Sequence, residues 1–199
     1  MKMVIVDANT WASVFDPNNK EHDEFSPIKK YVETKFNSMA WGGSQYVKEL
    51  KKCPKYLGIH AELTKGSRAV RFDDSAIDKE EKRVAILEKS NDFDDPHIIA
   101  IQIISKAPII CSTDARAHPF FKKKELYPEG HQRPKIYSNK TNRDLLQQIN
   151  FGGRSLQISL PRFLELEEPR RLERAFAPPA FHFSETSRLE KDLRTSIGK

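Results

Sequence analysis

Two short apolar segments, each leading into an aspartate, constrain the fold of this chain most strongly. The first is MVIV at residues 3–6, followed by Asp7, and the second is PIICS at residues 108–112, followed closely by Asp114. Apolar runs that are rich in β-branched residues and lack polar alternation are typical of strands buried on both faces. The sequence therefore predicts two central strands of a largely parallel sheet.

Segments with helical spacing alternate with the strands. Helices are expected at residues 11–15, 27–36, 44–50, 56–64, 77–89, 98–105 and 143–149. Shorter strands are expected at residues 39–41, 69–72 and 135–137, and Ser44 is expected to cap the helix that it begins. This alternation predicts an α/β fold, a three-layer α/β/α domain with a central, mostly parallel sheet.

The chain changes character near residue 150. Gly152 and Gly153 open a segment that four prolines interrupt, and only residues 186–196 have helical spacing. We therefore expect a folded domain at residues 1–149, followed by a C-terminal extension or arm at residues 150–199.

Composition narrows the class of protein only slightly. The net charge of +6, from 34 basic and 28 acidic residues, is compatible with a nucleic-acid partner but does not require one. Cys53 and Cys111 are the only cysteines, and neither lies in a Cys/His cluster. This pattern argues against a disulfide framework or a structural zinc site and favours a reducing cytoplasm. No apolar run approaches the roughly 20 residues of a membrane span, so no membrane partner is expected.

Four carboxylates occupy positions where a parallel sheet would gather them. Asp7 and Asp114 follow the two central strands, Asp95 precedes a predicted buried helix, and Glu49 lies on the helix that begins near Ser44. Sites in such sheets form beyond the carboxyl ends of the strands. Hard oxygen ligands without a thiolate or a histidine pair favour Mg²⁺ or Mn²⁺ over zinc. The sequence therefore predicts one or two such ions at these acids.

Four motifs in the chain together resemble the PIN domains, a family of nucleases. The motifs are VIVDANTWASVF, SQYVKEL, DDPHIIAIQ and IICSTDARA, and the resemblance covers roughly residues 1–147. It implies that the catalytic metal ligands are Asp7, Glu49, Asp95 and Asp114. It also implies that Ser112 is the hydroxyl of the turn before the last acid and that Asn9 supports the first.

Two of the four assignments have competitors. Glu33 and Glu62 lie on neighbouring predicted helices and compete with Glu49 for the second acid. At the third acid, Asp92 and Asp94 compete with Asp95.

Asp95 is preferred because Ala100 then stands where the family's helix carries a small residue. Asp94 is the reserve ligand, or a partner that orients bound water. The simpler readings are that Asp7 and Asp95 cap helices, that Asp114 stabilises a turn and that His97 packs in the core.

A basic stretch follows the fourth acid. It is expected to contact nucleic acid through Arg116, Lys122, Lys123 and Lys124. Such a stretch can follow an RNA backbone while interleaved aromatic rings, such as Phe120 and Tyr127, stack on bases. The simpler reading is a solvated helix face with Phe120 and Phe121 in the core.

The resemblance implies a Mg²⁺- or Mn²⁺-dependent endoribonuclease that leaves 5′-phosphate and 3′-hydroxyl ends. The family includes toxins that are paired with antitoxins, so the implied partners are an RNA substrate, an antitoxin or other protein bound through the C-terminal arm, and a second copy of the chain. A defence role is also open. The alternative is a catalytically silent PIN-like module that binds RNA or assembles proteins. A phosphatase of the haloacid dehalogenase type is disfavoured, because Asn9 stands where that family has its second aspartate.

Overall fold

The computed structural model describes residues 2–150, without the side chains of residues 148–150. The expected helix at residues 186–196 and nearly all of the expected C-terminal arm lie outside the described residues. The boundary between the domain and the arm therefore stays a prediction.

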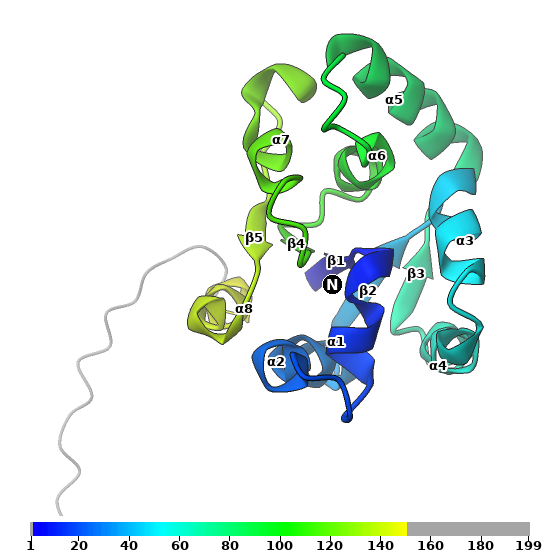
Figure 1. The fold of residues 1–199 in the computed structure, drawn as a ribbon, viewed down its shortest axis with the longest axis vertical. Coiled ribbons are helices and arrows are strands. Elements are labelled where there is room, and N and C mark those ends of the chain that lie inside the picture. Colours follow the sequence, from blue (N-terminus) through cyan, green and yellow to red (C-terminus); the bar gives the residue numbers. More distant parts are fainter. Residues whose placement is uncertain (1, 151–199) are drawn as a thin grey trace, which may run out of the picture. The chain divides into compact units, whose positions relative to one another are not determined.

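Five parallel strands form the central sheet, in the order β3-β2-β1-β4-β5 (Figure 1). They are β1 (Lys2–Val6), β2 (Asn37–Trp41), β3 (Ala69–Arg71), β4 (Ile109–Cys111) and β5 (Lys135–Tyr137). Every pairing of neighbouring strands is parallel, and all of β4 and the last three residues of β1 are buried. The predicted α/β class and the two central strands are confirmed, and the sheet is wholly parallel.

Helices cover both faces of the sheet, which confirms the three-layer architecture. Figure 1 shows α5, α6 and α7 on one face and α1, α2 and α8 on the other. The bounds are α1 (Trp11–Phe15), α2 (His22–Glu33), α3 (Ser44–Lys51), α4 (Leu57–Lys65), α5 (Asp74–Leu87), α6 (Pro96–Ser105), α7 (His118–Lys122) and α8 (Asp144–Asn150). Short 3-10 turns are η1 (Ala8–Thr10), η2 (Pro54–Tyr56), η3 (Lys124–Leu126) and η4 (Lys140–Asn142). None of the helices at residues 2–150 is long and apolar enough to cross a membrane.

The second helix differs from its predicted range. A start at Pro27 is wrong, because α2 begins at His22 and Pro27 lies inside it. A proline in that position removes one backbone hydrogen bond, yet the helix continues because residues such as Phe25 and Ile28 bury one face in the core. Two acidic side chains in the first turn also suit the positive end of the helix dipole.

Ser44 does not cap α3, contrary to the sequence-based expectation. The N-cap position belongs to Gly43, whose φ of 85° lies in the left-handed region. The Ser44 hydroxyl instead donates to Asp78 Oδ2 at 2.6 Å, and the backbone N–H of Gly43 donates to Asp74 Oδ1 at 2.9 Å. The start of α3 is therefore held by two carboxylates of α5, and this contact sets where α3 presents Glu49.

The strand order places a switch point between β1 and β4. From β1 the chain continues to β2 on one side, and β4 joins the other side after the crossover through α5 and α6. Connections that diverge in this way leave a crevice beyond the carboxyl ends of the two strands. Asp7 enters this region directly after β1, where its backbone N–H donates to the Cys111 carbonyl at 3.0 Å.

We expect Gly43→Ala to lower the free energy of unfolding by more than about 1 kcal/mol, because its backbone is left-handed and a new Cβ would lie 2.6 Å from Ile77 Cγ2. Gly58→Ala is the matched control, since a Cβ there meets nothing within 4 Å and alanine favours a helix by roughly 0.5–1 kcal/mol. Urea unfolding of both variants measures the difference. Equal effects of the two substitutions would contradict this account of the β2–α3 junction.

Candidate metal centre

Acidic side chains from three separate segments converge beyond the carboxyl ends of β1 and β4. Carboxylate oxygens of Asp94, Asp95 and Asp114 lie within 4.8 Å of one another. A second group with the same spacing joins Glu49, Asp95 and His97. Asp95 belongs to both groups, so it stands at the centre of the candidate site.

Ser112 joins the first and the fourth predicted acids. Its Oγ donates a hydrogen bond to Asp7 Oδ2 at 2.8 Å and accepts one from the backbone N–H of Asp114 at 3.1 Å. The other oxygen of Asp7 accepts from the backbone N–H of Asn9 at 3.2 Å. Asn9 therefore supports Asp7 through its backbone, and its own side chain is exposed. The Ser112 hydroxyl thus lies at the turn before Asp114, and its part in a catalytic site stays a prediction.

Asp7 is fully buried and belongs to neither group of closely spaced ligand atoms. Burial raises the pKa of its carboxyl, and the hydrogen bonds from Ser112 and Asn9 offset part of that effect. Its charge in turn acts on the carboxyl of Asp95. Asp7 therefore lies beside the cluster as an oriented acid that influences its charge.

Asp95 occupies the N-cap position of α6, but its carboxylate makes no capping hydrogen bond. The residue is only 6% exposed, and Pro96 follows at the first helical position. Burial raises the pKa of Asp95 to about 7, and the nearby charges of Asp7, Asp94 and Glu49 act in the same direction. A bound cation would relieve this crowding of negative charge.

Glu49 reaches the cluster from α3. Its Oε1 accepts a hydrogen bond from Gln45 Nε2 at 2.6 Å, and its Oε2 lies 3.1 Å from His97 Nε2. Burial acts to raise the pKa of Glu49, but the contacts with His97 and Gln45 and the charge of Lys52 together outweigh it, and the pKa lies below its usual value. The structure therefore places Glu49, the predicted acid with two competitors, within ligand distance of Asp95.

The competitors of Glu49 lie elsewhere. Glu33 and Glu62 are both exposed, and they line a groove between α2 and α4 together with Phe15 and Ile59. Neither belongs to the acidic groups at the crevice. The geometry therefore favours Glu49 as the second acid.

The three aspartates before α6 differ in their surroundings. Asp94 is exposed but lies within ligand distance of Asp95 and Asp114, as expected of a reserve ligand. Asp92 is exposed, and its backbone N–H donates to Ser90 Oγ. Asp92 belongs to neither group, so it takes no visible part in the site.

Arg116 lies on the cluster itself. Its guanidinium contacts Asp114 through Nη2 at 3.0 Å and Nε at 3.3 Å, and it approaches Asp94 at 3.9 Å. These hydrogen bonds hold the pKa of Asp114 below its ordinary value. The exposed guanidinium of Arg116 is therefore paired with Asp114, the acid that the resemblance assigns to metal binding.

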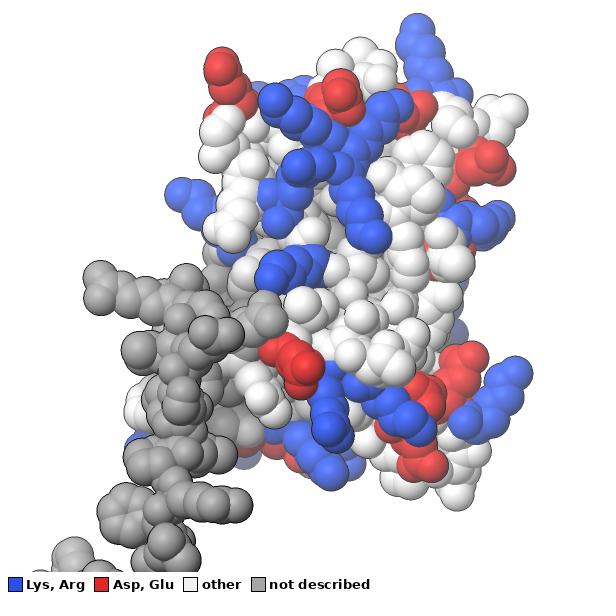
Figure 2. Space-filling view, turned by 90° about the vertical axis from the view of Figure 1, so that its left-hand side faces the viewer, with Lys and Arg blue, Asp and Glu red and all other residues white. Residues whose placement is uncertain are grey.

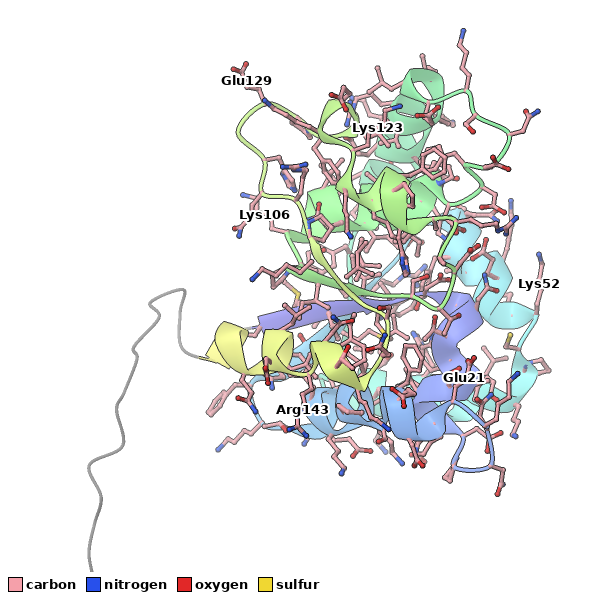
Figure 3. The ribbon with its side chains drawn as sticks, turned by 60° about the vertical axis from the view of Figure 1, so that its left-hand side comes forward. Glu21, Lys52, Lys106, Lys123, Glu129 and Arg143 are labelled. Atoms are coloured by element: carbon pink, nitrogen blue, oxygen red, sulfur yellow. The ribbon has the colours of Figure 1, made fainter. Side chains whose placement is uncertain are left out.

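The other basic residues predicted to contact nucleic acid are exposed around the end of α7. They are Lys122, Lys123 and Lys124. Figure 2 shows basic side chains gathered on the upper part of the face that it presents, and Figure 3 shows Lys106 and Lys123 on the same side of the sheet. Lys123 also contacts Glu88, and the Lys122 carbonyl accepts a hydrogen bond from Arg133. The face carries the positive charge that an RNA backbone would need.

The interleaved aromatic rings differ in exposure. Phe121 is fully buried and Tyr127 is nearly so, whereas Phe120 is half-buried and packs against Phe93 at a ring-centroid distance of 4.9 Å. Phe121 and Tyr127 belong to the core and are not exposed for stacking on bases, so the simpler reading fits these two rings.

His97 is the residue that sequence reasoning assigned only to packing. It is fully buried, and it lies in the same ligand group as Glu49 and Asp95. Its position two residues after Asp95, within the first turn of α6, is the one sequence signal that points toward the site.

Comparison of the chain with protein-family models, curated proteins and solved structures gave no match. The kind of site must therefore be inferred from the residues and geometry of this chain. It is a carboxylate cluster, with one imidazole, beyond the carboxyl ends of two parallel strands in an α/β/α domain. Such a donor set suits a divalent cation.

We expect Arg116→Gln to bind Mn²⁺ roughly 2- to 5-fold more tightly than the unaltered chain, because an exposed ion pair worth up to about 1 kcal/mol no longer competes for Asp114. Calorimetric titration measures the affinity. Arg143→Gln removes the same charge on the other side of the sheet and controls for net charge (Figure 3). Weaker binding by Arg116→Gln would show that the guanidinium supports the ion rather than competing with it.

Proposed function

We propose that this chain is a metal-dependent endoribonuclease of the PIN type. One observation carries the proposal: Asp95 lies within ligand distance of Asp114 in one group and of Glu49 in another, although the three come from distant parts of the sequence. Three of the four motifs that resemble PIN domains each contribute one of these acids, and the fourth contributes Asp7. A purely structural role for each acid would not require them to meet.

The residues present fit a divalent ion. The cluster is rich in carboxylate oxygens, and burial together with like charge raises the pKa of Asp95. Asp95 would hold an ion together with Asp94 and Asp114 or together with Glu49, and Asp7 would act on its charge from outside both groups. When bound, Mg²⁺ or Mn²⁺ supplies an activated water and neutralises charge on a phosphodiester.

The protein's own side chains would orient the substrate around that chemistry. Ser112 keeps Asp7 and the start of the Asp114 turn in register. Arg116 is exposed at the rim, where its planar guanidinium is suited to bind a phosphate in place of Asp114. Lys122 and Lys124, shortly after it in sequence, would follow the backbone of a bound RNA.

The biological setting follows from the same resemblance. A toxin that is neutralised by an antitoxin, or a defence ribonuclease, would need a protein partner, and residues 150–199 are the segment that we propose for this contact. Most of that segment lies outside the described residues, and so the partner stays a prediction.

We expect the purified chain to cleave single-stranded RNA when Mn²⁺ or Mg²⁺ is added and to stop when EDTA is added. Asp114→Asn removes a predicted ligand and should reduce the rate by more than about 100-fold, whereas Asp7→Asn removes a buried acid beside the cluster and should reduce it by roughly 10- to 100-fold. Asp92→Asn is the matched control, since it removes a nearby acid that belongs to neither ligand group. Gel analysis of end-labelled RNA measures the rates.

Cleavage that survives both substitutions would overturn the nuclease proposal. RNA binding without cleavage by the unaltered chain would instead support the alternative of a silent PIN-like module. A gel-shift titration of the same RNA, with and without the metal, distinguishes these two outcomes.

A further inference from the structure

His97 is fully buried, and both of its ring nitrogens lack a hydrogen-bond partner. Burying a polar group without a partner costs free energy, and such groups in native proteins usually have a functional explanation or a bound water or ion. His97 is therefore the feature of the site that the proposed function leaves unexplained.

The surroundings of His97 are acidic. Its Nε2 lies 3.1 Å from Glu49 Oε2, and a carboxylate oxygen of Asp95 lies within 4.8 Å of one ligand atom of each of these two residues. The approach to Glu49 is oblique, so that the ring N–H would not point at the carboxylate. Two ligand atoms that are both directed toward one ion also lie close together without being aligned with each other.

The spacing fits two ligands of one ion. Metal–ligand distances of about 2.1 Å at a right angle place neighbouring ligand atoms about 3.0 Å apart. The observed separation of 3.1 Å between the nitrogen and the Glu49 oxygen agrees with that value.

We propose that His97 Nε2 is a direct ligand of the divalent ion, together with Glu49 and Asp95, and that the site therefore prefers transition-metal ions to Mg²⁺. The inference rests on the metal centre of the proposed function and adds a nitrogen to its oxygen ligands. Imidazole binds first-row transition ions well, whereas Mg²⁺ selects oxygen. In this proposal a histidine nitrogen joins the carboxylate oxygens, whereas the sequence led us to expect oxygen ligands only.

A competing arrangement needs no metal. His97 could be protonated and form an ion pair with Glu49, which would explain the short distance but not the lack of alignment. Only the arrangement in which His97 is a metal ligand places a nitrogen atom in direct contact with a bound ion. A measurement of the atoms around the ion therefore distinguishes the two arrangements.

Pulsed electron paramagnetic resonance of Mn²⁺ bound to the full chain tests the ligand directly. We expect the hyperfine signal of a directly coordinated nitrogen, with the isotope change that ¹⁵N-histidine labelling produces. The measurement uses the unaltered protein, so the test does not depend on whether a variant folds.

The variant His97→Gln tests whether the nitrogen hyperfine signal comes from this residue. We expect it to abolish the nitrogen signal and to weaken Mn²⁺ binding about 10-fold or more, while Mg²⁺ binding changes much less. Thermal unfolding in EDTA checks that the variant is folded.

His60→Gln is the matched control. His60 is also buried with an unpartnered Nε2, but it packs against Trp11 and Trp41 and belongs to neither ligand group. Its substitution should leave the Mn²⁺ affinity and the nitrogen signal unchanged.

The outcomes separate this inference from the proposed function. Bound Mn²⁺ without a nitrogen signal overturns the inference, even if RNA is cleaved. A nitrogen signal that His97→Gln removes supports it, even if no RNA is cleaved, in which case the nuclease proposal alone fails. Absence of any divalent-ion binding overturns the inference as well.

Discussion

The parallel pairing of β1 with β4 is the constraint on which the candidate site depends. Val6 lies beside Cys111 in this pairing, so that the chain leaves both strands at the same edge of the sheet. The Ser112 hydroxyl then bridges Asp7 and the backbone of Asp114. Without this register, the two strand-end acids would not share one crevice, and the helix that carries Asp95 would have no partner site to face.

Holding these carboxylates close together costs electrostatic free energy. Several carboxylates lie close together at low exposure, and their mutual repulsion adds to the cost of burial. The fold compensates locally, with Ser112 and Asn9 on Asp7, Gln45 on Glu49 and Arg116 on Asp114. Asp95 receives no capping hydrogen bond, and its pKa is raised to about 7. The least compensated acid is therefore the one that is shared by both ligand groups.

Much of the fold could be predicted because its signals are local. Short β-branched runs predict buried strands, and spacing predicts most helices, so the strands and most helices appear near their expected places. The errors have a tertiary origin. Serine is a residue type that favours the N-cap position, but the Ser44 hydroxyl donates to Asp78 of α5 instead. Tyr127 follows a basic stretch, as a ring that stacks on bases would, but the core buries it.

The sequence alone determined the fold class and the acids that stand at strand and helix ends, because both follow from local chemistry and chain order. It could not rank Glu49 against Glu33 and Glu62, since identical side chains differ only in their surroundings. Nor could it separate a packed His97 from one that faces carboxylates. The tertiary structure decided these points, because proximity, burial and unpaired polar atoms arise only when distant segments meet.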